Sequence, residues 1–254
     1  MTRTAPTLRE IRDPLLVRTL VLIALGIGAF LLLAALVTHG TFQELDVRIL
    51  RELRKLAVRE DHPGRLWGEE SIIAITSLGA TITLVFACLV TLGFLLLTRK
   101  WHTSLVLVLV LCGAGGLNQW LKPHYDRARP DAVTHAQYVE SKSFPSGHAL
   151  LSTAVYGTLG AIGISLLQAR RLKIFLFSIT LVLILLIGLS RIYLGVHYAS
   201  DVMAGWIVGT VWSLACWLLA RHFARADRGF GETSVPDSAD TPMQTRPTGP
   251  NLRA

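Results

Sequence analysis

Three separated segments of the chain carry cations, imidazoles and a carboxylate at spacings that suit the cleavage of a phosphate ester. They read K-x6-R-P over 122–130, P-S-G-H over 145–148 and S-R-x5-H-x3-D over 190–201. A phosphate monoester repels anionic nucleophiles, so its cleavage needs cations around the non-bridging oxygens, an aligned nucleophile and a proton for the leaving oxygen. The three segments contain a candidate for each of these needs.

The two histidines and the aspartate are candidates for the covalent chemistry. His197 and Asp201 are four residues apart, which predicts that they share one helix face. Asp201 can then accept a hydrogen bond from one ring nitrogen of His197, leaving the other nitrogen to attack phosphorus. His148 is the candidate general acid for the departing alkoxide, and afterwards the base for water. One imidazole must therefore start neutral and the other protonated.

The remaining motif residues are candidates for holding the phosphate. Lys122, Arg129 and Arg191 supply positive charge, and arginine suits a two-pronged grip on phosphate oxygens. Ser146 is expected to cap a helix that begins after it, and Gly147 would let the backbone approach closely, so that free N–H groups face the phosphate. Each motif alone resembles an ordinary turn or polar loop. The prediction rests on all three occurring in order at the ends of apolar helices.

The elements that carry these motifs are strongly apolar. The chain is 52% hydrophobic with a mean hydropathy of +0.49, which is unusual for a soluble domain. Its apolar residues form blocks, such as the uncharged run 71–98, that are long enough to cross a hydrocarbon core of about 30 Å. The sequence therefore predicts an all-α integral membrane bundle with six transmembrane helices at 15–38, 72–97, 103–121, 149–168, 173–190 and 201–220.

This pattern divides the chain into three parts. We expect a basic cytoplasmic lead at 1–14, a six-span domain at 15–220 with its motif zone at 122–201, and a cytoplasmic, disordered tail at 221–254.

Two other patterns concern packing. In the segment 39–71, apolar residues recur at helical spacing, which predicts an amphipathic helix that either lies on the membrane surface or packs over the bundle. Gly205-x3-Gly209 predicts close contact between helices. The residues that form the apolar repeat are Phe42, Leu45, Ile49, Leu50, Leu53 and Leu56.

Six spans place the loops after the third and fifth spans on the same side of the membrane, so the motifs converge whichever way the protein inserts. Lysines and arginines are equally numerous on the two sides and do not decide the orientation. We favour termini inside, because the short loops near 99–100 and 170–173 are purely basic. The site would then face the periplasm or the outside of an inner (plasma) membrane.

The net charge of +8 is explained by basic loops beside membrane helices. No basic stripe with interleaved aromatic residues suggests nucleic acid, so none is expected as a partner. The expected partners are the bilayer and a lipid phosphate, and the oligomeric state is left open. The three cysteines lie within apolar spans, which argues against a disulfide framework.

Together the three segments resemble the signature of the type 2 phosphatidic acid phosphatase superfamily, membrane lipid phosphatases related to vanadium haloperoxidases. The resemblance implies that His197 is the nucleophile, Asp201 orients it and His148 is the acid, with no metal and no cofactor. One proline typical of bacterial members is replaced by Ala128, which affects none of these roles. The residues that it implies bind phosphate are Lys122, Arg129, Ser146, Gly147 and Arg191.

By this resemblance the chain would hydrolyse undecaprenyl pyrophosphate, phosphatidylglycerophosphate or phosphatidic acid, and the first two are favoured. One alternative is a lipid phosphotransferase, in which an acceptor hydroxyl replaces water at the same site. A remoter alternative is a non-enzymatic transporter with polar residues such as Asn118 and Gln119 inside the bundle. Transporters place polar groups near the middle of the membrane, whereas this polar set gathers at one surface.

Overall fold

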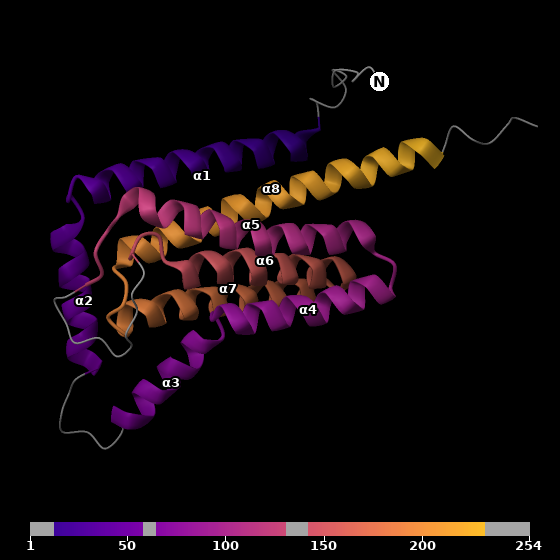
Figure 1. Ribbon diagram of the computed structural model, residues 1–254. Helices are drawn as coiled ribbons and strands as arrows, with labels where there is room; N and C mark the ends of the chain where they lie inside the picture. The colour runs from indigo at the N-terminus through magenta and orange to yellow at the C-terminus, as the bar shows by residue number, and fades with distance from the viewer. Residues whose placement is uncertain (1–12, 58–64, 131–141, 232–254) are drawn as a thin grey trace, which may run out of the picture.

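The regular structure in the described part of the chain is entirely helical. The structure is a computed structural model that describes residues 13–57, 65–130 and 142–231 (Figure 1). This confirms the predicted all-α class. The helices are α1 (Pro14–Thr38), α2 (Gln43–Ala57), α3 (Arg65–Ser77), α4 (Thr81–Leu97), α5 (Trp101–Tyr125), α6 (Gly147–Leu166), α7 (Arg170–Tyr193) and α8 (Ala199–Gly231).

Five described helices are each long and apolar enough to cross a membrane: α1, α5, α6, α7 and the Ala199–Arg221 part of α8. A sixth span requires α3 and α4 together, and these two helices are bent by 44°. The prediction of one uninterrupted helix over 72–97 is therefore wrong in this detail. The break contains Gly79, a weak helix former, and the freed carbonyl of Leu78 accepts a hydrogen bond from the Tyr156 hydroxyl at 2.7 Å.

Several helices continue beyond the spans predicted from hydropathy. α5 ends at Tyr125 and α7 at Tyr193, so Lys122 and Arg191 lie in final helical turns instead of loops. α8 continues to Gly231, into the predicted tail, because alanine and arginine there favour helix after the apolar run has ended. The rest of that tail, 232–254, and nearly all of the lead lie outside the described residues.

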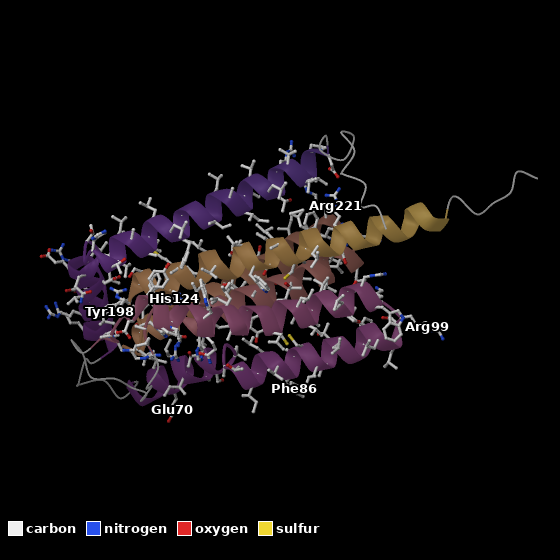
Figure 2. All side chains as sticks on the ribbon, turned by 45° about the horizontal axis from the view of Figure 1, so that its top comes forward. Glu70, Phe86, Arg99, His124, Tyr198 and Arg221 are labelled. Carbon is white, nitrogen blue, oxygen red and sulfur yellow. The ribbon has the colours of Figure 1, made fainter. Side chains whose placement is uncertain are left out.

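Most large apolar side chains of the long helices point outward, as a bundle in lipid requires. Ile82 and Leu97 of α4 are 80% and 87% exposed. Figure 2 shows Tyr198 and His124 toward one end of the bundle, and Arg99 and Arg221 toward the other. Charged and polar groups thus mark both ends of an apolar body.

α6 is the central helix and packs against α5, α7 and α8. The predicted close contact at Gly205 and Gly209 is confirmed. A Cβ added at Gly205 would lie 2.7 Å from the Ser146 carbonyl oxygen, and one at Gly209 would lie 2.6 Å from the Leu150 carbonyl oxygen. The backbones of α6 and α8 therefore touch, and the Ser146 N–H donates to the Asp201 carbonyl at 3.0 Å.

α2 crosses one end of the bundle, nearly at right angles to the long helices (Figure 1). Its Leu50 is fully buried in a cluster with Ile192, Tyr198 and Val202, at the junction of α7 and α8. Of the two arrangements predicted for this amphipathic helix, packing over the bundle describes the structure.

Candidate active site

The motif residues meet at the end of the bundle that α2 crosses. There α5 and α7 end while α6 and α8 begin, so that residues far apart in the sequence become neighbours. His148 lies within electrostatic range of His197 and of the three motif cations. The predicted convergence is thus observed. The predicted residues gathered at this end are Lys122, Arg129, Ser146, Gly147, His148, Arg191, His197 and Asp201.

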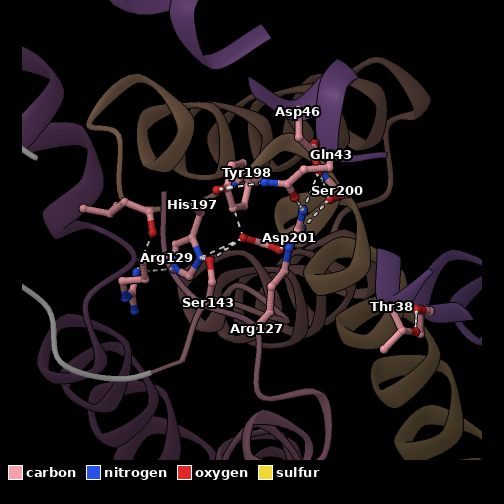
Figure 3. Close-up of polar contacts among 12 residues, drawn as sticks. Thr38, Gln43, Asp46, Arg127, Arg129, Ser143, His197, Tyr198, Ser200 and Asp201 are labelled. Atoms are coloured by element: carbon pink, nitrogen blue, oxygen red, sulfur yellow. Dashed lines mark hydrogen bonds and ion pairs between the residues drawn. The ribbon is translucent and has the colours of Figure 1, made fainter. Parts of the chain in front are cut away.

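His197 is buried, and its two ring nitrogens face different surroundings (Figure 3). Nδ1 lies 3.5 Å from Asp201 Oδ2 and 3.3 Å from the Ser143 hydroxyl, which itself donates to Asp201 Oδ2 at 2.5 Å. Nε2 lies 3.3 Å from Nη1 of Arg129. A guanidinium can only donate, so this network assigns the lone pair to Nε2 and the proton to Nδ1.

The closeness of His197 and Asp201 does not come from a shared helix face, and that prediction is wrong. α8 begins at Ala199, so His197 precedes it, while Asp201 lies in its first turn. The turn after α7 is closed by Gly195, whose φ of 75° favours glycine. The Asp201 carboxylate then accepts the Tyr198 N–H at 2.9 Å, which fixes it under the turn that carries His197.

Neighbouring groups hold Arg129 and Arg191 in place. Arg129 donates to the Val196 carbonyl at 2.6 Å, next to the imidazole of His197. Arg191 is 3% exposed and donates to the Thr76 hydroxyl of α3 at 2.9 Å. α3 thus contributes directly to the site, because it carries Thr76.

The break between α3 and α4 also makes room for His148. A Cβ added at Gly79 would lie 3.3 Å from Cδ2 of His148, a tight contact. The backbone turn at Gly79 therefore packs against the imidazole that the sequence predicts to be the general acid.

The start of α6 differs from the prediction in one respect. Ser146 occupies the N-cap position, but its hydroxyl makes no capping hydrogen bond. Its Oγ is buried, and it has no hydrogen-bond partner among the described residues, as is also true of Asn118 Oδ1. Gly147 faces Asn118, since a Cβ there would lie 3.1 Å from Nδ2. Buried polar atoms are normally paired, so these two atoms suit a bound polar ligand.

Several polar residues of the site were missed by the sequence prediction. Arg127 donates to Asp201 Oδ1 at 2.6 Å and to Asp46 Oδ2 at 2.9 Å. A signal for Asp46 existed: it lies four residues from both Phe42 and Leu50, within the apolar stripe of α2. An acid in that stripe requires a buried partner. The other missed residues are Ser143, Ser200 and Thr76.

Burial sets the protonation of this site. It lowers the pKa of His197 to about 4, although the hydrogen bond and charge of Asp201 act in the opposite direction. Burial also lowers the pKa of Arg129, partly offset by Asp201. Burial acts on Arg127 as well, but Asp201 and Asp46 raise its pKa overall. At neutral pH, a neutral imidazole therefore faces fixed cations.

The described residues include no group of three or more His, Cys, Asp or Glu side chains that could hold a metal ion. Nε2 of His197 presents its lone pair beside the positive charge of Arg129.

Sequence comparison relates the chain to known proteins. Residues 103–225 match the model of the PAP2 superfamily. Phosphatidylglycerophosphatase B of Bacillus subtilis (strain 168) is 33% identical over 181 residues, which cover 71% of this chain and 85% of that protein. An undecaprenyl-diphosphatase of Sulfolobus acidocaldarius is 31% identical over 118 residues, covering 44% and 52% of the two chains.

Comparison with solved structures shows that the fold of this chain is also similar to that of known proteins. The crystal structure of a transmembrane PAP2-type phosphatidylglycerolphosphate phosphatase from Bacillus subtilis matches with a TM-score of 0.68 and 29% identity, over 80% of this chain and 96% of that one. Aquifex aeolicus LpxE matches with a TM-score of 0.51 and 24% identity, over 68% and 94%, a likeness of fold alone.

Proposed function

This chain belongs to the PAP2 superfamily and is a multi-pass membrane hydrolase, and from that premise we propose that it cleaves a phosphomonoester or diphosphate of a membrane lipid through a phosphohistidine. The observation that carries the proposal is the orientation of His197. Its Nδ1 is backed by Ser143 and Asp201, and its Nε2 faces Arg129. This arrangement suits a neutral nucleophile that attacks an anionic group held by cations.

Phosphate binding is proposed for the motif residues around Nε2. Lys122, Arg129 and Arg191 would surround the non-bridging oxygens, with the arginines offering paired N–H donors. The start of α6 adds the Ser146 hydroxyl and the N–H groups that follow it, Gly147 included, at the positive end of the helix dipole. The buried, unpaired Oγ of Ser146 supports this assignment.

In the first chemical step, Nε2 of His197 forms a bond to phosphorus while the bond from phosphorus to the leaving oxygen breaks. His148 donates a proton to that oxygen. The leaving group is the lipid alcohol when the substrate is a phosphomonoester, and the lipid monophosphate when it is a diphosphate. Asp201 accepts the Nδ1 proton in a hydrogen bond and stabilises the positive charge that develops on the imidazole.

In the second step, His148 removes a proton from water, whose oxygen attacks phosphorus as the P–N bond breaks. Inorganic phosphate leaves, His197 returns to its neutral form and His148 is again protonated. The cycle therefore consumes one water and leaves the protein unchanged.

The substrate is proposed to be a lipid with a terminal phosphate or diphosphate. One relative is named for phosphatidylglycerophosphate and the other for undecaprenyl diphosphate, which supports testing both. The inner (plasma) membrane is the proposed location, with the site on the periplasmic or outer side. Basic residues at the opposite end, including Arg99, Arg170 and Arg171, support this orientation. The catalytic domain proposed is 15–220, between an inside lead and an inside tail.

The function is tested by a phosphate-release assay in detergent micelles, with wild type beside His197→Ala. Phosphatidic acid, phosphatidylglycerophosphate and undecaprenyl diphosphate are the probes. We expect wild type to release phosphate from at least one of them, without loss in EDTA and with inhibition by vanadate, which mimics five-coordinate phosphorus. A strict requirement for Mg²⁺ would contradict the mechanism, and release only after adding an alcohol acceptor would indicate phosphotransfer.

The lowered pKa of His197 predicts its titration. Histidine-selective ¹⁵N labelling, with His197→Gln to assign the signal, should show an imidazole that stays neutral from pH 8 to about 5 and titrates near pH 4. In the unfolded chain the pKa is about 6.5, so unfolding takes up a proton between about pH 6.5 and 4. The free energy of unfolding should therefore fall as the pH falls through that window. A midpoint above pH 6 would refute the assigned neutral state.

A further inference from the structure

We propose that Asp46 of α2 is a positioning residue for this reaction, acting through Arg127 and Ser200 on Asp201. The proposal rests on the proposed function. Asp46 lies outside all three sequence motifs, on a helix that crosses the end of the bundle. Its carboxylate is 2% exposed and is part of a network that leads to the partner of His197.

Arg127 is the centre of this network. Its Nη1 donates to Asp201 Oδ1 at 2.6 Å and to the Ser200 hydroxyl at 2.8 Å, while Nη2 donates to Asp46 Oδ2 at 2.9 Å. The guanidinium also lies 4.2 Å from the centroid of the Tyr198 ring. A planar guanidinium held by two carboxylates and an aromatic face has little freedom to rotate.

Asp46 also holds the first turn of α8. Its Oδ1 accepts the Ser200 N–H at 3.0 Å, and its Oδ2 accepts the Ser200 hydroxyl. A carboxylate near a helix N-terminus satisfies an otherwise unpaired N–H and interacts favourably with the helix dipole. Ser200 immediately precedes Asp201, so α2 fixes the backbone that carries the carboxylate.

The two oxygens of Asp201 have separate partners. Oδ1 faces Arg127, whereas Oδ2 faces Ser143, the Tyr198 N–H and Nδ1 of His197. In Figure 3, Arg127 lies on the side of Asp201 away from His197. This division orients the carboxylate so that one oxygen remains directed at the imidazole.

The charge balance shows why Asp46 matters. One partly buried guanidinium pairs with two buried carboxylates, so neither carboxylate binds both of its terminal nitrogens. Without the charge of Asp46, Arg127 is free to pair through both nitrogens with Asp201, the arrangement that arginine and carboxylate prefer. That pairing would draw Asp201 away from His197. Loss of Asp46 should therefore slow the chemical step without weakening phosphate binding.

The test measures kcat and KM for the probe lipid that wild type hydrolyses fastest. Asp46→Asn should lower kcat by about 10- to 100-fold and change KM by less than about threefold. The size of the kcat effect is taken from metalloenzymes, in which loss of a group that orients a histidine ligand has a similar effect. Glu44→Gln, an exposed acid on the same helix, is the matched control and should keep kcat within about twofold.

A double-mutant cycle separates positioning from simple stabilisation. If Asp46 acts largely through Arg127, adding Asp46→Asn to Arg127→Met should lower kcat by a clearly smaller factor than Asp46→Asn lowers the kcat of wild type. Fully additive effects would overturn the proposal, as would a kcat for Asp46→Asn equal to that of Glu44→Gln.

Ser200→Ala provides a second variant that removes no charge, should Asp46→Asn fail to fold. It breaks the hydroxyl link to Asp46 and should lower kcat at least threefold at constant KM, and an unchanged kcat would overturn the proposal. Wild type and His197→Ala run beside these variants. Release by both at equal rates would refute the proposed function itself, whereas an active wild type with unaffected Asp46 and Ser200 variants would refute only the positioning role.

Discussion

His197→Ala is expected to lower phosphate release by about 10⁴-fold or more, to the level of buffer alone, because no other group replaces the attacking nitrogen. The neighbouring cations would remain, so lipid phosphate should still bind. The measurement is initial-rate phosphate release in micelles, with protein amount corrected for the folded fraction by size-exclusion chromatography. Substitution leaves a cavity beside Arg129, so thermal unfolding is recorded on the same samples.

The matched control for this variant is His124→Ala. His124 is exposed at the same end of the bundle, and its Nδ1 lies 2.9 Å from the Trp120 carbonyl. Its replacement should leave kcat within about twofold of wild type. Wild-type rates in folded His197→Ala would exclude His197 as the nucleophile.

Asp201→Asn is expected to lower kcat by about 10²- to 10⁴-fold, as when the orienting carboxylate of a catalytic triad is lost. The Asp201 oxygens accept hydrogen bonds from Arg127, Ser143 and the Tyr198 N–H. The NH₂ group of an asparagine can only donate, so it cannot accept any of these bonds. The substitution also removes the negative charge that stabilises the imidazolium. The KM should change far less than kcat, because the carboxylate faces the imidazole and not the phosphate.

Asp126→Asn is the control for this second variant. Asp126 is 70% exposed and pairs with Lys142 at 2.5 Å, so it shares the location but not the burial. Loss of the Asp126 carboxylate should change kcat and the stability of the protein very little, since exposed ion pairs contribute little to stability. A fall in kcat of less than about threefold for Asp201→Asn would contradict the role assigned to the carboxylate.

The sequence predicted the body of the fold well because lipid imposes simple rules. A helix in a membrane must satisfy its own backbone and present apolar side chains, which produces long uncharged runs. The same rule places polar residues at helix ends, so the sequence predicts that the motifs around Lys122, His148 and Asp201 lie on one side of the membrane. The close helix contact at Gly205 and Gly209 could likewise be predicted, because only small residues permit two helix backbones to touch.

The details that escaped prediction depend on tertiary contacts. At the break near Gly79, the Leu78 carbonyl accepts a hydrogen bond from Tyr156 and the backbone packs against His148, and hydropathy predicts neither contact. The position of His197 before α8 depends on the left-handed turn at Gly195. Local spacing predicted a helical i,i+4 pair because it contained no information on where the helix begins.

The supporting network was the largest omission. Asp46 and Arg127 are far apart in the sequence, and neither shows its function in local spacing. The only available signal was an acid within the apolar stripe of an amphipathic segment. Such an acid either faces solvent or has a buried cation for a partner, and only the packing of α2 across the bundle shows which applies.

The most direct test of the central claim is to trap the covalent intermediate. The enzyme is mixed with a ³²P-labelled lipid phosphate for milliseconds, quenched with alkali, in which phosphohistidine survives, and digested for mass spectrometry. We predict one phosphate on the peptide that contains His197, at a level that is lost in His197→Ala and that decays at the rate of turnover. Turnover with the phosphate on another side chain, or with no labelled protein at any time, would contradict the mechanism.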